Sequence, residues 1–309
     1  MWAPGPVEQI LVSVPVNPGT NILPIIVPPP AGVGAGPTFA RFRISSAGGL
    51  APTGFAQDGE VEDHLVMVFE DGKLDWGDAP DPTYPTLMAN LGAAHWITAL
   101  FLGGGIDAEP DGQPDPTATG DDLAGIDDED GIGFTTEWIS GYNADITVTA
   151  SQPGTLQAWA DLDGDGTWLQ SSEVIIAGVP VGAGITSFTI PVPAGIGPMN
   201  AFARFRLTPT GVGVGYDGYV QGGEVEDYMV PVGKRIGATI QVTPGGSPTT
   251  VTLNWTAEPG ATQYSVYSST TLAGPFPSNW TLEASGIAGT TWNQAFAGPR
   301  KFYIVVAFP

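Results

Sequence analysis

The sequence predicts an all-β protein made of tandem β-sandwich domains that carry long acidic, metal-binding loops. Its 309 residues include 44 glycines and 30 prolines without a Gly-X-Y period, and the apolar residues come in short runs between them. Such runs are typical of short strands joined by turns. Hydrophobic residues make up 42% of the chain, which is enough for packed cores. A duplicated block of sequence indicates that one structural unit is used at least twice.

The duplicated block is GEVEDH at residues 59–64, which returns as GEVEDY at residues 223–228. The letters FARFR precede both copies, at residues 39–43 and 202–206. The second copy has a long stretch of sequence before it, whereas the first copy lies close to the start of the chain. We therefore expect the first unit to be incomplete.

Three domains follow from this comparison. Residues 1–70 are expected to be the second half of one sandwich, residues 74–232 a complete sandwich, and residues 237–309 a smaller sandwich. The boundaries fall in polar, charged stretches at residues 70–73 and 233–235.

Strands in the complete unit are predicted from apolar–polar alternation and from flanking Gly and Pro. They lie at residues 146–150, 156–160, 173–180, 187–192, 202–207 and 224–230. A short helix is expected around residues 87–91. Residues 103–133 are expected to form a long loop, and long loops in compact domains are usually functional or disordered.

The composition excludes several classes of function. There are 9 Lys+Arg against 32 Asp+Glu, a net charge of −23, which excludes a nucleic-acid partner because no basic face is available. The absence of Cys excludes disulfides, and only 2 His make a zinc site or a His-based triad improbable. No apolar run is long enough to span a membrane, and no signal-peptide pattern follows Met1.

The segment after the predicted strand at residues 156–160 has the spacing of a calcium-binding loop. Asp161, Asp163 and Asp165 alternate before Gly166, and Glu173 follows near the position of a closing ligand. No helical pattern flanks the segment, so it is not an EF-hand. The alternative is a plain acidic β-turn.

Further acidic residues gather where Lys and Arg are absent, between Lys73 and Arg204. Carboxylates at this density repel one another, and Ca²⁺ would neutralise them. The candidate ligands in addition to the calcium-type loop are Asp75, Asp78, Asp107, Asp111, Asp121, Asp122, Asp127, Asp128 and Asp130. The alternative is a solvated acidic loop that binds no ion.

The FARFR and GEVED strands are expected to pair as an antiparallel hairpin. Alternation places Ala203, Phe205 and Leu207 on one face of the first strand, and Arg204 and Arg206 on the other. We expect an ion-pair ladder on the arginine face. Its members are Arg204 and Arg206 with Glu224 and Glu226, and in the first copy Arg41 and Arg43 with Glu60 and Glu62. Alternatively, Glu224 or Asp227 reaches a metal held by the acidic loop.

Two resemblances follow from these motifs. The combination of DWGDAPD at residues 75–81, the acidic loop and GEVEDY resembles the GEVEDY-type domain of large secreted bacterial surface proteins, over residues 75–232 and, for its second half, 6–68. This resemblance implies an extracellular, repetitive architecture. The C-terminal segment resembles a fibronectin type III domain, through VTLNW at residues 251–255, ATQYSVY and KFYIVVA.

The function expected from the sequence is non-enzymatic: a calcium-stabilised structural repeat of a bacterial surface fibre, sheath or matrix. The carboxylates lie in Gly/Asp turns that suit ions, not at isolated apolar sites that would tune a catalytic acid. The incomplete first unit predicts assembly with other copies, head to tail, by β-strand contacts. The alternative is an adhesive or carbohydrate-binding module, with surface glycans as partners and Trp residues as stacking platforms.

Overall fold

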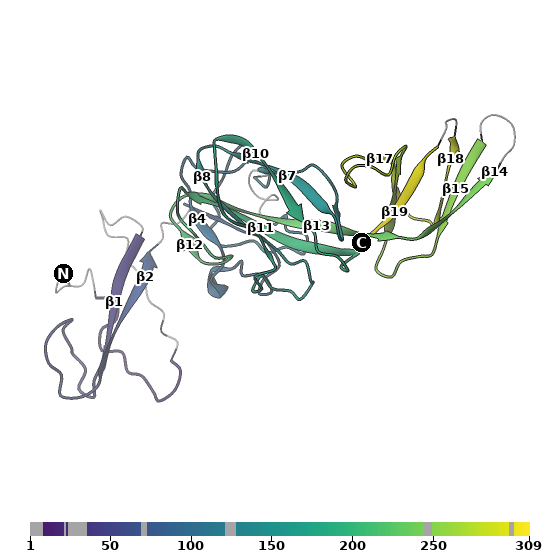
Figure 1. Cartoon of the computed structure of the whole chain (residues 1–309). Helices are drawn as coiled ribbons and strands as arrows, with labels where there is room; N and C mark the ends of the chain where they lie inside the picture. The colour runs from purple at the N-terminus through teal and green to yellow at the C-terminus, as the bar shows by residue number, and fades with distance from the viewer. Residues whose placement is uncertain are drawn as a thin grey trace. The chain divides into compact units, whose positions relative to one another are not determined.

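The described chain is built from β-strands, with one short 3-10 helix, and the all-β prediction is confirmed. The computed structural model describes residues 9–21, 23, 36–68, 73–120, 128–243, 249–296 and 300–309. The chain forms two compact units, Met1–Asp71 and Gly72–Pro309. Figure 1 shows the strands of each unit. No helix among the described residues is both long and apolar enough to cross a bilayer.

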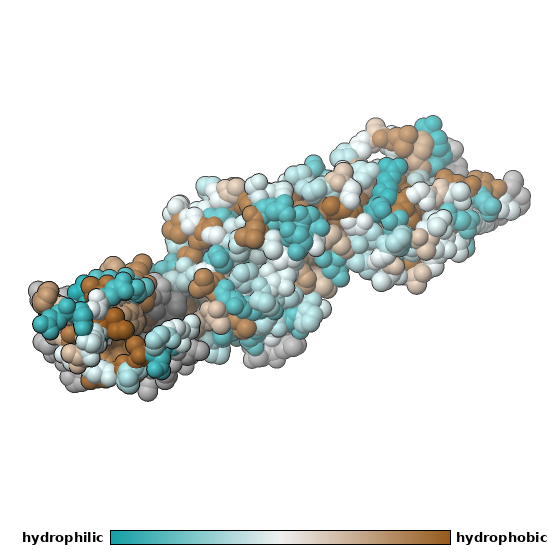
Figure 2. Space-filling view, turned by 90° about the horizontal axis from the view of Figure 1, so that it is seen from below, coloured by the Kyte–Doolittle hydropathy of each residue, from teal (hydrophilic) through white to brown (hydrophobic). Residues whose placement is uncertain are grey.

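The first unit contains one antiparallel hairpin, β1 (Gly36–Ile44) paired with β2 (Glu60–Val68). Its side chains leave apolar surface accessible on both faces: Phe39 on one face is 64% exposed, and Ile44 on the other is 50% exposed. Figure 2 shows hydrophobic residues among hydrophilic ones on the surface of the first unit, at the left of the view. Within its described residues, this hairpin therefore lacks the second layer that a sandwich requires.

The second unit contains the remaining strands. In chain order they are β3 (Leu74–Trp76), β4 (Ala94–Trp96), β5 (Ile132–Phe134), β6 (Trp138–Ile139), β7 (Asn143–Ala150), β8 (Gly154–Ala160), β9 (Val174–Val181), β10 (Gly184–Pro191), β11 (Met199–Pro209), β12 (Tyr219–Val220), β13 (Glu224–Ile236), β14 (Ala238–Thr243), β15 (Thr249–Trp255), β16 (Gln263–Ser269), β17 (Thr281–Ile287), β18 (Thr291–Phe296) and β19 (Phe302–Phe308). The predicted strands of the complete unit correspond to β7, β8, β9, β10, β11 and β13. The helix expected around residues 87–91 is the 3-10 turn η1 (Met88–Asn90).

The central sandwich has two sheets with a continuous core between them. The smaller sheet has the order β10-β7-β5, and the larger one contains β13-β11-β8-β9 (Figure 1). Ile146 and Val148 of β7 pack in the same core cluster as Leu156 of β8 and Phe205 of β11. The alternation in β7, buried at every second residue, follows from the pleat of a strand with one face in the core.

The outer face of the larger sheet is also covered. A small sheet of order β12-β4-β3 packs against β13, and Pro85 and Thr86, just before η1, accept hydrogen bonds from Arg204 of β11. This cover leaves Arg204 and Arg206 of β11 with no exposed surface. The side of β11 that the sequence marks as polar is therefore an interior surface.

Strand β13 connects the central sandwich to the C-terminal one without a break. Its last residues, Lys234–Ile236, pair with β19, so the larger sheet continues into β16 and β17. The second C-terminal sheet has the order β14-β15-β18, and Trp255 and Tyr264 lie in the core between the sheets. The polar residues 233–235, predicted as a boundary, are part of this shared strand.

Candidate metal centre

The loop between β8 and β9 brings together the residues selected for a calcium-type site. Asp161, Asp163, Asp165 and Glu173 each offer a carboxylate oxygen, and these oxygens lie within 4.8 Å of one another. Asp161 and Glu173 are buried, whereas Asp163 and Asp165 are exposed. The group therefore spans the edge of the sandwich, with two ligands held by the core and two facing solvent.

The loop geometry follows from its glycines and from side-chain caps. Gly164 and Gly166 have φ angles of +74° and +82°, a conformation that favours glycine. Asp161 accepts hydrogen bonds from the backbone N–H groups of both, at 2.7 and 2.9 Å. Tyr84 donates to the same carboxylate at 2.6 Å. These contacts fix the turn and hold the Asp161 carboxylate inside it.

Glu173 is the least satisfied member of the group. Its Oε2 accepts the backbone N–H of Gln170 at 2.8 Å, while its Oε1 is buried without a hydrogen-bond partner. Burial raises the pKa of Glu173 to about 7, and the negative charges of Asp165, Asp163 and Asp161 act in the same direction. A buried carboxylate oxygen without a donor is uncommon in folded proteins, and a cation is one way to satisfy it.

The loop is tied to the core through Trp168. Its indole N–H donates to the carbonyl of Phe202 at 3.1 Å, and the Arg204 guanidinium lies 4.7 Å from the centre of its ring. Trp168 packs with Tyr84 and Trp159 in a separate cluster on this side of the sheet. Order in the β8–β9 loop is thus coupled to the packing around Arg204.

The structure uses several of the other predicted ligands as caps for backbone N–H groups. Asp78 accepts from Gly120, Asp111 from Met88 and Gly112, and Asp130 from Gly104. Together with Asp107, these residues lie outside the two acidic groups of metal-binding geometry found among the described residues. Asp121, Asp122 and Asp127 lie outside the described residues.

The second acidic group joins Asp75, Asp128 and Glu224, whose ligand atoms also lie within 4.8 Å of one another. All three residues are buried. They come from β3, from the end of the acidic loop that precedes β5, and from the first position of β13. This group matches the alternative in which a glutamate of the GEVED block meets the acidic loop.

The predicted ion-pair ladder is wrong by one residue of register. In the hairpin, Arg204 lies opposite Asp227 and Arg206 lies opposite Val225. Glu224 and Glu226 therefore point to the other face, since directly opposite residues share a face and neighbours alternate. In the first unit, Arg41 likewise lies opposite Asp63 and Arg43 opposite Val61, so Glu60 and Glu62 are not their partners.

Arg204 and Asp227 form a fully buried, bidentate ion pair. Nε and Nη2 of Arg204 donate to the two oxygens of Asp227 at 2.7 and 2.6 Å. Asp227 also accepts the backbone N–H groups of Asp78 and Ala79, both at 2.9 Å. The carbonyl of Pro85 accepts from Arg204 at 2.6 Å. The pair thereby fastens the covering segment to the sheet.

Arg206 has no carboxylate partner of this kind and is satisfied by neutral acceptors. It donates to the backbone carbonyls of Gly215, Asp217 and Gly218 and, at 2.9 Å, to Nε2 of His95. Burial lowers the pKa of Arg206 to about 9. Burial and the Arg206 charge hold the pKa of His95 well below its usual range, so this imidazole is neutral. The sequence offered no signal for this contact, because 111 residues separate the two side chains.

The glutamates of the GEVED block hold the acidic loop from the core side. Glu226 accepts the backbone N–H of Gly131 at 2.8 Å and the hydroxyl of Tyr228 at 3.0 Å. Glu224 accepts the backbone N–H of Leu102. Burial raises the pKa of Glu226 to about 8. Glu224 and Glu226 therefore hold a loop against one face of β13, and Asp227 holds the covering segment against the other face.

The first hairpin repeats the arginine contacts on an exposed surface. Arg41 forms the same bidentate pair with Asp63, at 2.6 and 2.5 Å. Arg43 donates to the carbonyls of Ala51, Thr53 and Gly54, and Arg206 donates to three carbonyls that each lie one position further along the chain from it. The duplicated sequence therefore specifies a duplicated local structure, and what differs between the two copies is the cover.

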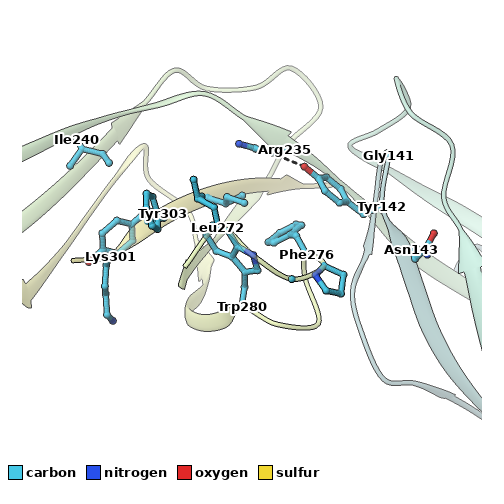
Figure 3. A pocket seen from close by; sticks show the side chains of 14 residues that line it. Gly141, Tyr142, Asn143, Arg235, Ile240, Leu272, Phe276, Trp280, Lys301 and Tyr303 are labelled. Atoms are coloured by element: carbon cyan, nitrogen blue, oxygen red, sulfur yellow. Dashed lines mark hydrogen bonds between the residues drawn. The ribbon is translucent and has the colours of Figure 1, made fainter. Parts of the chain in front are cut away.

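A shallow cavity of about 750 Å³ lies where the C-terminal sandwich meets the β6–β7 turn. Figure 3 shows Tyr142, Phe276 and Trp280 close together along it, with Arg235 donating to the Tyr142 hydroxyl at 2.9 Å. The Phe276 ring has edge contacts with the rings of Tyr142, Tyr267 and Trp280. These aromatic rings mainly form the packing between the two sandwiches.

Comparison with known families agrees with this description of the sandwich. The model of the GEVED domain matches residues 155–231, which run from β8 to β13 and include both the Asp161 loop and the GEVEDY block. This region is therefore a GEVED-type domain. No curated protein matches the chain.

Proposed function

We propose that this chain is a non-enzymatic, calcium-stabilised structural repeat of an extracellular bacterial surface protein. The observation that carries the proposal is the group formed by Asp161, Asp163, Asp165 and Glu173, with its unsatisfied Glu173 oxygen. The GEVED-type domain and the duplicated hairpin support a repetitive architecture. The C-terminal sandwich would be a fibronectin type III-like spacer, and residues 1–70 part of a second GEVED-type unit.

The chemistry of the Asp161 group fits Ca²⁺ better than other common ions. Its donors are hard carboxylate oxygens on an irregular loop, and Ca²⁺ accepts roughly six to eight such ligands in flexible geometry. Water would complete the coordination on the side of the exposed Asp163 and Asp165. The ion would then order a loop whose Trp168 packs against Arg204, so metal binding stabilises the fold rather than activating a substrate.

Thermal unfolding with calcium and with a chelator tests the proposal. At free Ca²⁺ about 100-fold above Kd, one site adds roughly 2.7 kcal/mol to the unfolding free energy. The melting temperature of the second unit is expected to rise by several degrees in millimolar Ca²⁺ relative to EGTA. Equal melting temperatures in the two buffers would contradict a stabilising role for calcium.

A matched pair of variants assigns the effect to the loop. Asp165 is capped by the backbone and hydroxyl of Thr167, and Asp115 is capped by Thr117 in the same way. Asp165→Asn should abolish much of the calcium-dependent rise in melting temperature. Asp115→Asn, which removes the same charge from an equivalent turn outside the group, should leave the rise intact.

Assembly into an array is the second part of the proposed function. In the central sandwich, Phe205 and Leu207 face the core, whereas their counterparts Phe42 and Ile44 are 37% and 50% exposed. Exposed apolar faces and free strand edges promote association. We propose that a neighbouring copy packs on this face and pairs with the edge of β1, head to tail, which generates an open filament.

Sedimentation in calcium buffer tests this assembly. The wild-type chain should form concentration-dependent oligomers, and Phe42→Ser should weaken them. Phe55→Ser serves as the control, because Phe55 is 92% exposed but lies in the loop between the strands. A stable monomer at every concentration, with protected amides in β1 and β2, would rule out the need for a partner.

An adhesive role is the alternative, and the aromatic cavity of Figure 3 is the observation that favours it. Aromatic rings beside Arg235 and Lys301 can bind sugars by stacking and hydrogen bonding. It ranks second because Phe276 is only 7% exposed and its ring is enclosed by other rings. Binding on a glycan array that is lost in Trp280→Ala would favour the adhesive role.

A further inference from the structure

Three buried carboxylates meet at the start of the GEVED block. Asp75, Asp128 and Glu224 are 3%, 5% and 1% exposed. A ligand atom of each lies within 4.8 Å of those of the other two. Confining three negative charges away from water at this separation is strongly unfavourable unless a cation or protons neutralise them.

Backbone N–H groups donate hydrogen bonds to each of the three carboxylates. Asp75 accepts the backbone N–H of Val225 at 2.8 Å, and Asp128 accepts that of Asp107 at 3.1 Å. Glu224 accepts the backbone N–H of Leu102 through Oε2. The other oxygen of Glu224, Oε1, is buried and has no hydrogen-bond partner. It is an acceptor without a donor in a group that already holds excess negative charge.

The electrostatics around Glu224 agree with this geometry. Burial is the main cause that raises the pKa of Glu224 well above its ordinary value. The charges that act most strongly on it belong to Glu226, Asp75 and Asp128, and all of them are negative.

We infer that Asp75, Asp128 and Glu224 form a second divalent-cation site, separate from the Asp161 loop, and that its ion is calcium. The three ligands come from β3, the acidic loop and β13, which are far apart in the sequence. One ion there joins the covering segment and the acidic loop to the first glutamate of the GEVED block. All-oxygen ligands on one loop and two strands suit Ca²⁺ rather than zinc.

The inference gives the GEVED block a second role. Asp227 fastens the covering segment by an ion pair on the outer face of β13. Glu224 would fasten the same segment and the acidic loop through a metal ion at the strand's first residue. The equivalent glutamate of the first block, Glu60, is exposed, and among the described residues it belongs to no metal-binding group. Glu60 therefore provides an internal control.

Calcium stoichiometry of the full chain, measured by equilibrium dialysis, tests the site. Glu224→Gln keeps the shape and an oxygen for Leu102 but removes the charge. It should bind one Ca²⁺ fewer than the wild type, and so should Asp128→Asn. Glu60→Gln should bind the same number as the wild type. Combining Glu224→Gln with Asp165→Asn should remove two ions, which separates this site from the Asp161 loop.

The rival explanation is that Glu224 is a protonated, neutral acid. In that case Glu224→Gln binds as much calcium as the wild type and is at least as stable in EGTA and in Ca²⁺. That result, or unchanged stoichiometry in Asp128→Asn, overturns the inference. Circular dichroism of both variants in calcium establishes that they fold, and Asp128→Asn decides the question if Glu224→Gln does not.

Discussion

Arg204–Asp227 and Arg41–Asp63 are the same ion pair in two different environments. Both are bidentate and cross the same hairpin register. The side chains of the first pair are 0% exposed, whereas those of the second are 26% and 47% exposed. A pair in water is worth little, but a buried charge that loses its partner is strongly destabilising. The chain therefore contains its own comparison of a buried with an exposed ion pair.

Arg204→Ala is expected to destabilise the second unit by about 3–5 kcal/mol, because it leaves Asp227 charged, buried and without its cation. Arg41→Ala should have a far smaller effect on its own hairpin. Urea unfolding measures the first change, and amide hydrogen exchange in β1 and β2 measures the second. Similar losses of protection around the two pairs would contradict the role assigned to burial.

The Glu137 carboxyl should make the unfolding free energy depend on pH without the involvement of a metal ion. Burial raises its pKa to about 7, and its Oε2 is buried without a hydrogen-bond partner. The folded state therefore holds this proton more tightly than the unfolded state, whose ordinary pKa is 4.5. Its contribution to stability is present below about pH 4.5 and is lost as the pH rises to about 7.

Glu137→Gln should remove this loss. At pH 8 the variant is expected to be more stable than the wild type by about 1–2 kcal/mol, a figure reduced for the partial exposure of the carboxylate. Near pH 4.5 the two proteins should be equally stable. The measurement is urea unfolding in EGTA at both pH values. If the variant and the wild type differ in unfolding free energy by the same amount at both pH values, the Glu137 carboxyl does not titrate between them.

The hairpin that carries the GEVED block depends on a glycine at its start. Gly59 and Gly223 have φ angles of +96° and +97°. A Cβ on Gly223 would lie 1.8 Å from the carbonyl oxygen of Leu207, and one on Gly59 would lie 1.7 Å from that of Ile44. The backbone therefore requires glycine as the first residue of the block, and the later residues place their side chains on the two faces of the strand.

Gly223→Ala is expected to destabilise the second unit by several kcal/mol, since it combines left-handed strain with a backbone clash. Gly211→Ala is the matched control: its φ is +83°, but its Cβ would meet nothing within 4 Å. Gly211→Ala should lower the unfolding free energy by only about 1 kcal/mol. Chemical unfolding of both variants compares them, and equal losses would show that the clash is relieved by small backbone shifts.

At the scale of the whole molecule, the two predicted boundaries behave differently. The division between the two compact units, between Asp71 and Gly72, falls within the predicted boundary at residues 70–73. Residues 234–236 lie within β13, pair with β19, and include Lys234 in an ion pair with Glu258 at 2.6 Å. Val306 and Phe308 of β19 pack in one cluster with Ile139 of the central sandwich. The central and C-terminal sandwiches therefore share a strand and a core.

Limited trypsin digestion should distinguish these boundaries. Cleavage is expected after the exposed Lys73, with products that begin at Leu74 accumulating. Lys234 and Arg235 should resist cleavage for much longer, because a paired strand cannot enter a protease active site without local unfolding. Mass spectrometry identifies the products. Early cuts at residues 234 or 235 would show that the two sandwiches are independently mobile.

The sequence by itself determined the features that depend on local patterns. Alternation and Gly/Pro spacing predicted the strands β7, β8, β9, β10, β11 and β13, because a strand with one face in the core must alternate. The spacing of Asp161, Asp163 and Asp165 predicted their convergence, since a short loop between two paired strands confines its own side chains.

Only the tertiary structure decided which residues meet across the fold. The sequence showed arginines facing carboxylates but could not set the register, and a shift of one residue exchanges Glu226 for Asp227 as the partner of Arg204. It marked the arginine face as polar, whereas the cover from residues 74–120 buries it. Asp75, Asp128 and Glu224 meet because three distant segments pack at one end of β13. Local sequence sets which face a side chain takes, and long-range packing sets what that face meets.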